Sequence, residues 1–263
     1  MGRVANLLLA DLTTLARRRW VLAAGAVGAA LTLFFGLGDS GADYQRNVAA
    51  VLALGGLAVA LGLGAPALVR DLESGVFGLF GGAGATASDI GWARLASRAI
   101  ALVAVLVLWS IAAQVGSLVS GDGLDGDLAL HSALTIEVLL LVLLAAAGAA
   151  TLVGVAAGAI FGLVVFITAQ AVVNLKAAAD QGLIGNGASG LDLAYWLLPR
   201  AVVSPMLADL QAADEGGPVA PQVEINGNIV EVPAAELDTV LWTLAWCGLF
   251  LGLAIFGLRR REL

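Results

Sequence analysis

The chain has 263 residues, of which 60% are hydrophobic and only 13% are charged, and its formal net charge is −7. Its mean hydropathy of +0.96 is far above that of a water-soluble domain of this length, so an ordinary soluble fold is excluded. The 34 glycines, many inside apolar runs, favour helices that pack closely in a bilayer. We therefore expect an all-α integral membrane protein with a single transmembrane domain over residues 1–263.

The first segment, residues 1–19, mixes apolar side chains with Arg3 and Asp11 and ends in three consecutive arginines. This pattern predicts an amphipathic helix that lies in the membrane interface. The three arginines follow the apolar residues instead of preceding them, which is the reverse of a cleavable signal peptide. The first hydrophobic span is therefore expected to stay in the protein.

Apolar runs long enough to cross a bilayer occur six times in the sequence. A helix with a rise of ~1.5 Å per residue needs about 20 apolar residues to cross ~30 Å of hydrocarbon. The fourth and fifth runs are nearly continuous, so a hairpin is expected between Gly148 and Gly154. The predicted spans are 20–37, 48–69, 99–119, 132–148, 151–175 and 239–258.

The distribution of Lys and Arg predicts the orientation. With a cytoplasmic N-terminus, ten basic residues fall on the inside and only three on the outside, as the positive-inside rule requires. Both termini are then cytoplasmic. Residues 70–98 become a cytoplasmic segment, and residues 176–238 become the largest extracytoplasmic connection. The acidic residues gather in the outer loops and make the outer face negative.

The connection 176–238 has predicted structure of its own. Residues 191–213 are helix-like but interrupted by two prolines. Residues 223–232 alternate in side-chain character around Asn226-Gly227, which is a strong signal for a two-residue hairpin turn. We expect a small extracytoplasmic cap built from a helix and a hairpin.

Several kinds of catalytic and metal site are excluded by composition. The only lysine, Lys176, lies between Leu175 and Ala177, so the chain has no phosphate-binding loop and is not expected to hydrolyse ATP by that route. A single histidine and the lack of convergent acids within the spans disfavour a membrane-embedded hydrolase, so we do not expect an enzyme. One histidine and one cysteine rule out a His/Cys zinc cluster. His131 is expected in a solvated position at the start of the fourth span. We expect no nucleic-acid partner.

A carboxylate inside the fourth span, that of Glu137, is costly there unless it is protonated, paired or in contact with water. In one interpretation it snorkels to the outer interface. In the other it lines an exit vestibule together with Gln114, Gln170 and Asn174, which would form part of a translocation path. The sequence leaves both interpretations open.

The segment that follows the second span opens with charged residues and continues with Leu72, Val76, Phe77 and Leu79 on or near one helical face. This pattern predicts a short amphipathic cytoplasmic helix. Its apolar face is expected to pack on a partner protein or to lie on the bilayer.

The same segment carries a family resemblance. The order Arg70-Asp71-x-Glu73-Ser74-Gly75-Val76-x-x-Leu79 resembles the stretch between spans two and three of the type-2 ABC exporter permeases, and the following Gly91-Trp92-Ala93-Arg94 resembles their glycine-lysine pair before span three. The order of the whole chain is similar too. An N-terminal amphipathic helix precedes six spans, a large outer connection comes before the sixth, and the chain ends in an arginine-rich tail.

The resemblance implies a transport subunit of the prokaryotic plasma (inner) membrane. Two permease subunits, expected as a homodimer, would form the path, and a separate cytoplasmic ABC ATPase would bind ATP and Mg, so this chain itself needs no cofactor. An extracytoplasmic protein is a further partner that suits the acidic outer face. The alternative is an ATP-independent secondary carrier or channel. The resemblance assigns these residues to the coupling helix that docks on the ATPase: Arg70, Asp71, Glu73, Ser74, Gly75, Phe77 and Leu79.

Overall fold

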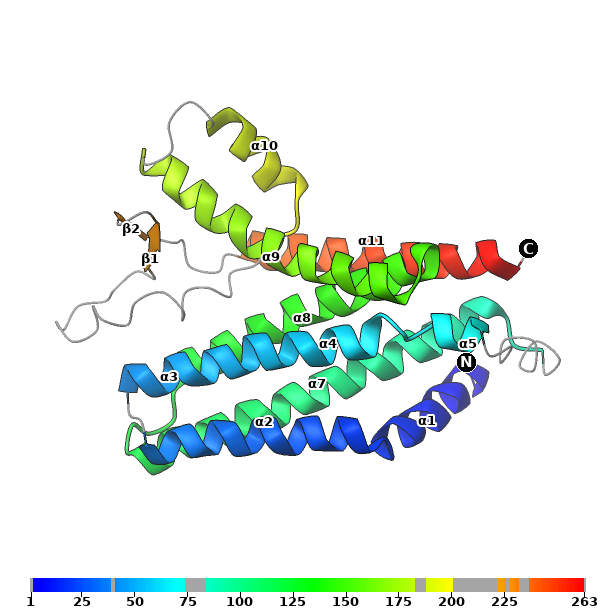
Figure 1. Ribbon diagram of the computed structural model, residues 1–263, viewed down its shortest axis with the longest axis horizontal. Helices are drawn as coiled ribbons and strands as arrows, with labels where there is room; N and C mark the ends of the chain where they lie inside the picture. The colour runs from blue at the N-terminus through cyan, green and yellow to red at the C-terminus, as the bar shows by residue number, and fades with distance from the viewer. Residues whose placement is uncertain are drawn as a thin grey trace.

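A computed structural model describes residues 2–38, 41–73, 84–182, 188–200, 222–225, 228–231 and 237–262. Within them, six helices are long and apolar enough to cross a membrane, which confirms the expected helical membrane fold. Both chain termini lie at the same end of the bundle (Figure 1). The six candidate spans are Arg19–Gly38, Tyr44–Gly64, Ala87–Ser120, Leu128–Val153, Val155–Asp180 and Leu237–Arg260.

Helix α7 (Ala87–Ser120) is the longest element, and α1 (Gly2–Ala16) and α2 (Arg19–Gly38) both pack along it (Figure 1). Its 34 residues extend roughly 51 Å at 1.5 Å per residue, well beyond the hydrocarbon core. Residues 87–98, expected only as part of the segment before span three, therefore belong to a continuous helix. A capping box starts it, because the Thr86 hydroxyl accepts from the Asp89 N–H and the Asp89 carboxylate accepts from the Thr86 N–H.

The second span is built from three pieces. Helix α3 (Gly41–Ala50) continues through a π-helical turn, η1 (Val51–Gly55), into α4 (Gly56–Gly64). A Cβ atom at Gly64 would lie 2.5 Å from the Leu143 carbonyl oxygen, so glycine is needed where α4 meets α8. The short helix α5 (Val69–Glu73) follows at the end of the molecule where both termini lie (Figure 1).

Helices α8 (Gly126–Val153) and α9 (Val155–Asp180) form an antiparallel hairpin (Figure 1). The chain reverses at Gly154, whose φ of +103° lies in the region that favours glycine. Helix α8 starts six residues before the predicted span, and the Asp125 carboxylate accepts from the Leu128 N–H in its first turn at 3.0 Å.

The C-terminal part begins with α10 (Ala188–Leu197), followed by strands β1 (Gln222–Ile225) and β2 (Asn228–Glu231) and by α11 (Leu237–Glu262). The strands pair antiparallel with Ile225 opposite Asn228. Asn226 and Gly227, at which the sequence pattern indicated a turn, lie outside the described residues. Helix α11 packs against α8 and α7. The side of the membrane on which the hairpin lies stays a prediction.

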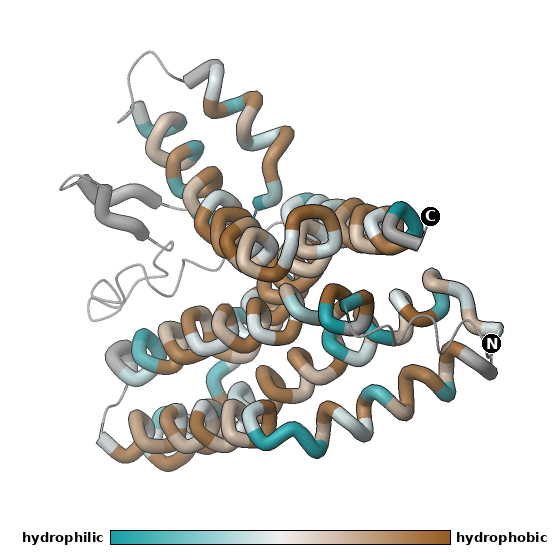
Figure 2. The backbone as a smooth tube through the Cα atoms, turned by 45° about the vertical axis from the view of Figure 1, so that its right-hand side comes forward, coloured by the Kyte–Doolittle hydropathy of each residue, from teal (hydrophilic) through white to brown (hydrophobic). Residues whose placement is uncertain are grey.

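The buried apolar residues form a large cluster in the middle of the bundle, where the second span, α7 and α8 meet. Large apolar side chains also remain exposed on the outside, for example Phe34, Ile160 and Phe256. Apolar residues run along all six spans (Figure 2). An apolar exterior suits a lipid solvent, in which exposed apolar surface has no cost.

Candidate functional site

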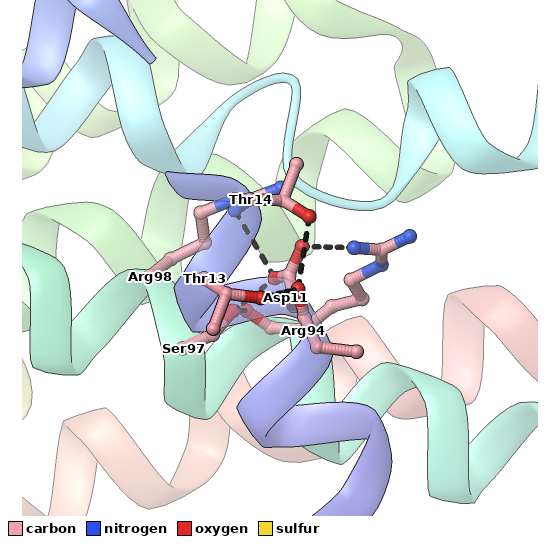
Figure 3. A network of polar contacts seen from close by, with 7 residues as sticks. Asp11, Thr13, Thr14, Arg94, Ser97 and Arg98 are labelled. Atoms are coloured by element: carbon pink, nitrogen blue, oxygen red, sulfur yellow. Dashed lines mark hydrogen bonds and ion pairs between the residues drawn. The ribbon is translucent and has the colours of Figure 1, made fainter. Parts of the chain in front are cut away.

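A buried, charged site joins α1 to the extended N-terminal part of α7. Asp11 is 3% exposed, and its carboxylate lies between two arginines of α7 (Figure 3). Arg98 Nη1 is 3.1 Å from Asp11 Oδ2, and Arg94 Nη1 pairs with Asp11 Oδ1. The Ser97 hydroxyl donates to Asp11 Oδ2 and to the Arg94 carbonyl. We call Asp11, Arg94, Ser97 and Arg98 the α1–α7 clamp.

The positions of the three α7 residues explain the clamp. Residues 94, 97 and 98 are three and four apart, so their side chains share one face of α7. This face lies against α1, whose Leu15 is buried one turn beyond Asp11. A carboxylate inside a protein is tolerated only when it is paired and hydrogen-bonded. The Asp11 carboxylate has both an ion pair and a hydrogen bond. The clamp therefore fixes α1 to α7.

A second connection at the same end of the bundle is apolar. Residues of α7, α8 and α11 form a buried cluster with Leu68, which precedes α5. Leu72 of α5 and Leu7 of α1 pack against it. Gly91 allows the close approach of α11, because a Cβ atom there would lie 3.0 Å from Ile255 Cδ1. We call this group the basal cluster, and it links α5 to four other helices. Its buried members are Ala67, Leu68, Ala87, Ile90, Leu95, Ala147, Ala254, Ile255 and Leu258.

The residues assigned to the coupling helix are only partly within the described chain. Arg70, Asp71 and Glu73 belong to α5, and the side chains of Arg70 and Glu73 are exposed. Their charged groups are thus available to a partner. Four further residues of this assignment lie outside the described residues: Ser74, Gly75, Phe77 and Leu79.

The residues predicted to line a translocation path are dispersed. The Gln114 side chain donates to the Asp125 carbonyl at 2.8 Å and accepts from the Asp125 N–H at 3.0 Å, so it holds the loop between α7 and α8. Gln170 and Asn174 are half-buried one turn apart on α9. Glu137 Oε1 is buried and has no hydrogen-bond partner. The path assignment stays a prediction.

A buried arginine that the sequence did not single out connects α10 to α11. Arg200 is 2% exposed, and its guanidinium carbon lies 4.4 Å from the ring centre of Tyr195, 5.1 Å from that of Trp196 and 5.6 Å from that of Trp242. Asp238 Oδ2 lies 3.4 Å from Nη1. Arginine stacks on aromatic faces and favours this geometry. We call these five residues the arginine cage.

Backbone contacts fix the arginine cage in place. The Thr243 hydroxyl donates to the Arg200 carbonyl at 2.5 Å, and the Trp242 indole N–H donates to the Leu198 carbonyl at 3.0 Å. Tyr195 and Trp196 are adjacent in the sequence, but Trp242 lies far from them, so no local pattern brings the three rings to Arg200. Tyrosine and tryptophan are also common at membrane interfaces, so their presence does not by itself indicate a contact with an arginine.

Replacing Arg200 with lysine is expected to lower the free energy of unfolding by about 1–2 kcal/mol, because lysine keeps the charge but loses the planar stacking on three rings. Thermal unfolding of the detergent-solubilised protein measures this as a lower Tm. The matched control is Arg260→Lys, at an exposed position of α11, which should leave Tm unchanged. Equal Tm values for the two variants would show that the arginine cage does not stabilise the protein.

Within the described part of the chain, no group of three or more His, Cys, Asp or Glu side chains could hold a metal ion. Comparison of the chain with family models, curated proteins and solved structures found no match.

Proposed function

We propose that the chain is the membrane-spanning permease subunit of an ABC transporter in a prokaryotic plasma membrane. It works as a homodimer with a separate cytoplasmic ATPase, which binds ATP and Mg, and exports or delivers an unidentified substrate. In this proposal α5 opens the coupling segment, and its exposed charges face the ATPase.

The observation that carries the proposal is the position of α5 on the basal cluster. A coupling element has to transmit a displacement to the spans, and Leu72 packs against the basal cluster, whose buried members include residues of α7, α8 and α11. Packed interiors respond to such a displacement as rigid units instead of absorbing it locally. A push on α5 would thus reach several spans together.

The α1–α7 clamp supports the proposal in a second way. Leu7 packs on the basal cluster, and Asp11 is paired with Arg94 and Arg98. Helix α1 is therefore connected to the same end of α7 that α5 approaches, and α2 follows α1 directly. A movement of α5 would be shared by α1 and would reach the first span through the residues between α1 and α2.

The test is co-purification with the ABC ATPase encoded beside this chain, followed by measurement of ATP turnover in vesicles. Glu73→Arg reverses an exposed charge of α5 and should lower turnover by about 5-fold or more. A factor of about 5 corresponds to a coupling free energy of about 1 kcal/mol, at the lower end of the usual range. The control is Asp192→Arg, an exposed acid on α10, which should leave turnover unchanged. Turnover equal in both variants and the parent would show that α5 is not the coupling element.

One observation favours the alternative, an ATP-independent carrier. Glu137 Oε1 is buried without a partner inside a span, and intramembrane carboxylates often mark ion or substrate pathways. The same vesicles separate the two functions. If an ion gradient drives solute transport by the purified chain without any ATPase, the chain is a carrier and the permease proposal fails.

A further inference from the structure

A lateral groove opens on the surface of the bundle between α2 and the second span, with α7 beneath it. Its volume is about 490 Å³. The lining side chains are apolar except for Asn47 and the indole N–H of Trp109. The indole N–H donates to the Gly25 carbonyl at 3.0 Å, so its polar atom is satisfied inside the protein. The groove is thus apolar, and it opens on the outer surface of the bundle, where the lipid would lie.

Two glycines, one from α2 and one from the second span, allow the Trp109 ring to lie between these helices. A Cβ atom on Gly28 would overlap this ring, and one on Gly55 would lie 3.0 Å from it. Gly55 ends the π-helical turn η1, and Val51 and Leu54 of the same turn also line the groove. A π-helical turn is wider than an α-helical one, is costly to form, and occurs frequently at functional sites.

The length of the groove matches one leaflet. It runs along α2 from Ala24 to Phe35 and along the second span from Asn47 to Val59. These stretches rise roughly 16 to 18 Å at 1.5 Å per residue, and half of a 30 Å hydrocarbon core is about 15 Å. Phe35 and Asn47 lie three residues inside the ends of their spans. The groove therefore extends from one membrane border to about the midplane.

The occupant of the groove has to be apolar and has to lie lengthwise between two neighbouring spans. A second copy of the chain would cover this face with a packed helix and make the protein dimeric. A single flexible hydrocarbon chain can enter.

We propose that the groove binds one acyl chain of a membrane phospholipid, with the headgroup at the Asn47 end. Arg46, next to Asn47, is the only basic residue between Arg19 and Arg70, and it brings a positive charge to the end where the phosphate lies. The acyl chain contacts Trp109 where this residue lines the groove. This lipid site is independent of the proposed export function and of the ATPase.

The test uses contact quenching of tryptophan emission by brominated acyl chains. The full-length protein is placed in phosphatidylglycerol vesicles and in vesicles of the same lipid brominated at mid-chain. The difference in emission between the parent and Trp109→Phe is the emission of Trp109 alone. Although Trp109 is only 3% exposed, most of this emission should be lost in the brominated lipid. Emission of Trp109 that is equal in the two lipids would overturn the proposal.

A groove-filling variant makes the result specific. Ala58→Phe places a ring across the groove from an exposed rim position and should restore the Trp109 emission. Ala30→Phe, on the exposed side of α2 and outside the groove, should leave the quenching as in the parent. Equal quenching in both variants would contradict the proposal, and so would unquenched emission from a protein that is dimeric through this face.

Native mass spectrometry gives a readout that does not depend on Trp109→Phe. After extraction, the parent and Ala30→Phe should each retain one phospholipid per chain that Ala58→Phe lacks. Loss of lipid from all three proteins alike would contradict the site.

Discussion

Replacing Asp11 with alanine is expected to lower the free energy of unfolding by about 3–5 kcal/mol, because it removes one side of a buried ion pair and leaves the other inside the protein. The side chains of Arg98 and Arg94 are only 7% and 18% exposed, so their charges would lose the carboxylate between them without gaining full hydration. Thermal unfolding in detergent measures the loss as a lower Tm.

Two controls make the Asp11 result specific. Asp11→Asn keeps the shape and a hydrogen-bond acceptor but removes the charge, so its Tm should lie between those of the parent and Asp11→Ala. Thr13→Ala changes an exposed residue of the same helix, whose hydroxyl only donates to the Ala10 carbonyl, and should stay within about 0.5 kcal/mol of the parent. A Tm for Asp11→Ala equal to that of Thr13→Ala would contradict the clamp.

The second large effect is expected at the crossing of α2 and α7. A Cβ atom on Gly36 would lie 2.6 Å from the Gly116 Cα atom, so the two backbones are in direct contact. Gly36→Val would force the helices apart, and we expect it to lower the free energy of unfolding by about 2–3 kcal/mol. The displacement would also disturb the Tyr44 hydroxyl, which packs on Gly116 and donates to the Ala113 carbonyl at 2.5 Å.

The same helix offers a matched control. Gly38 has no atom within 4 Å of an added Cβ, so Gly38→Val places the same side chain in open space. Its Tm should stay close to that of the parent, whereas that of Gly36→Val should fall. If both variants unfold at the same temperature, the close approach of α2 and α7 is not required for stability.

The number of spans could be predicted from the sequence because it depends only on run length and hydropathy. The starts of α7 and α8 were not predicted, because these helices begin at a capping residue and not at the first residue of the apolar run. The Thr86 and Asp89 capping box and the Asp125 carboxylate are visible in the sequence, but they precede the apolar runs. With α8 starting at Gly126, Glu137 lies eleven residues into the helix instead of five into the span.

The buried polar sites could not be predicted, because they depend on which helix faces meet. Asp11 is 83 residues from Arg94 in sequence, and nothing in the local pattern joins them. His131 was expected to be solvated, and this was wrong. It is 4% exposed, because the first turns of α8 pack inside the bundle, and its Nε2 lies 3.4 Å from the Thr135 hydroxyl.

The most direct test is to determine on which side of the membrane α5 lies. Single cysteines are introduced as Glu73→Cys and, at the opposite end of the bundle, as Asp122→Cys, both in a Cys247→Ala background. Intact cells are treated with a membrane-impermeant thiol reagent before and after permeabilisation. We predict that Asp122→Cys reacts in intact cells and that Glu73→Cys reacts only after permeabilisation. Reaction of Glu73→Cys in intact cells would contradict both the orientation and the proposed coupling to a cytoplasmic ATPase.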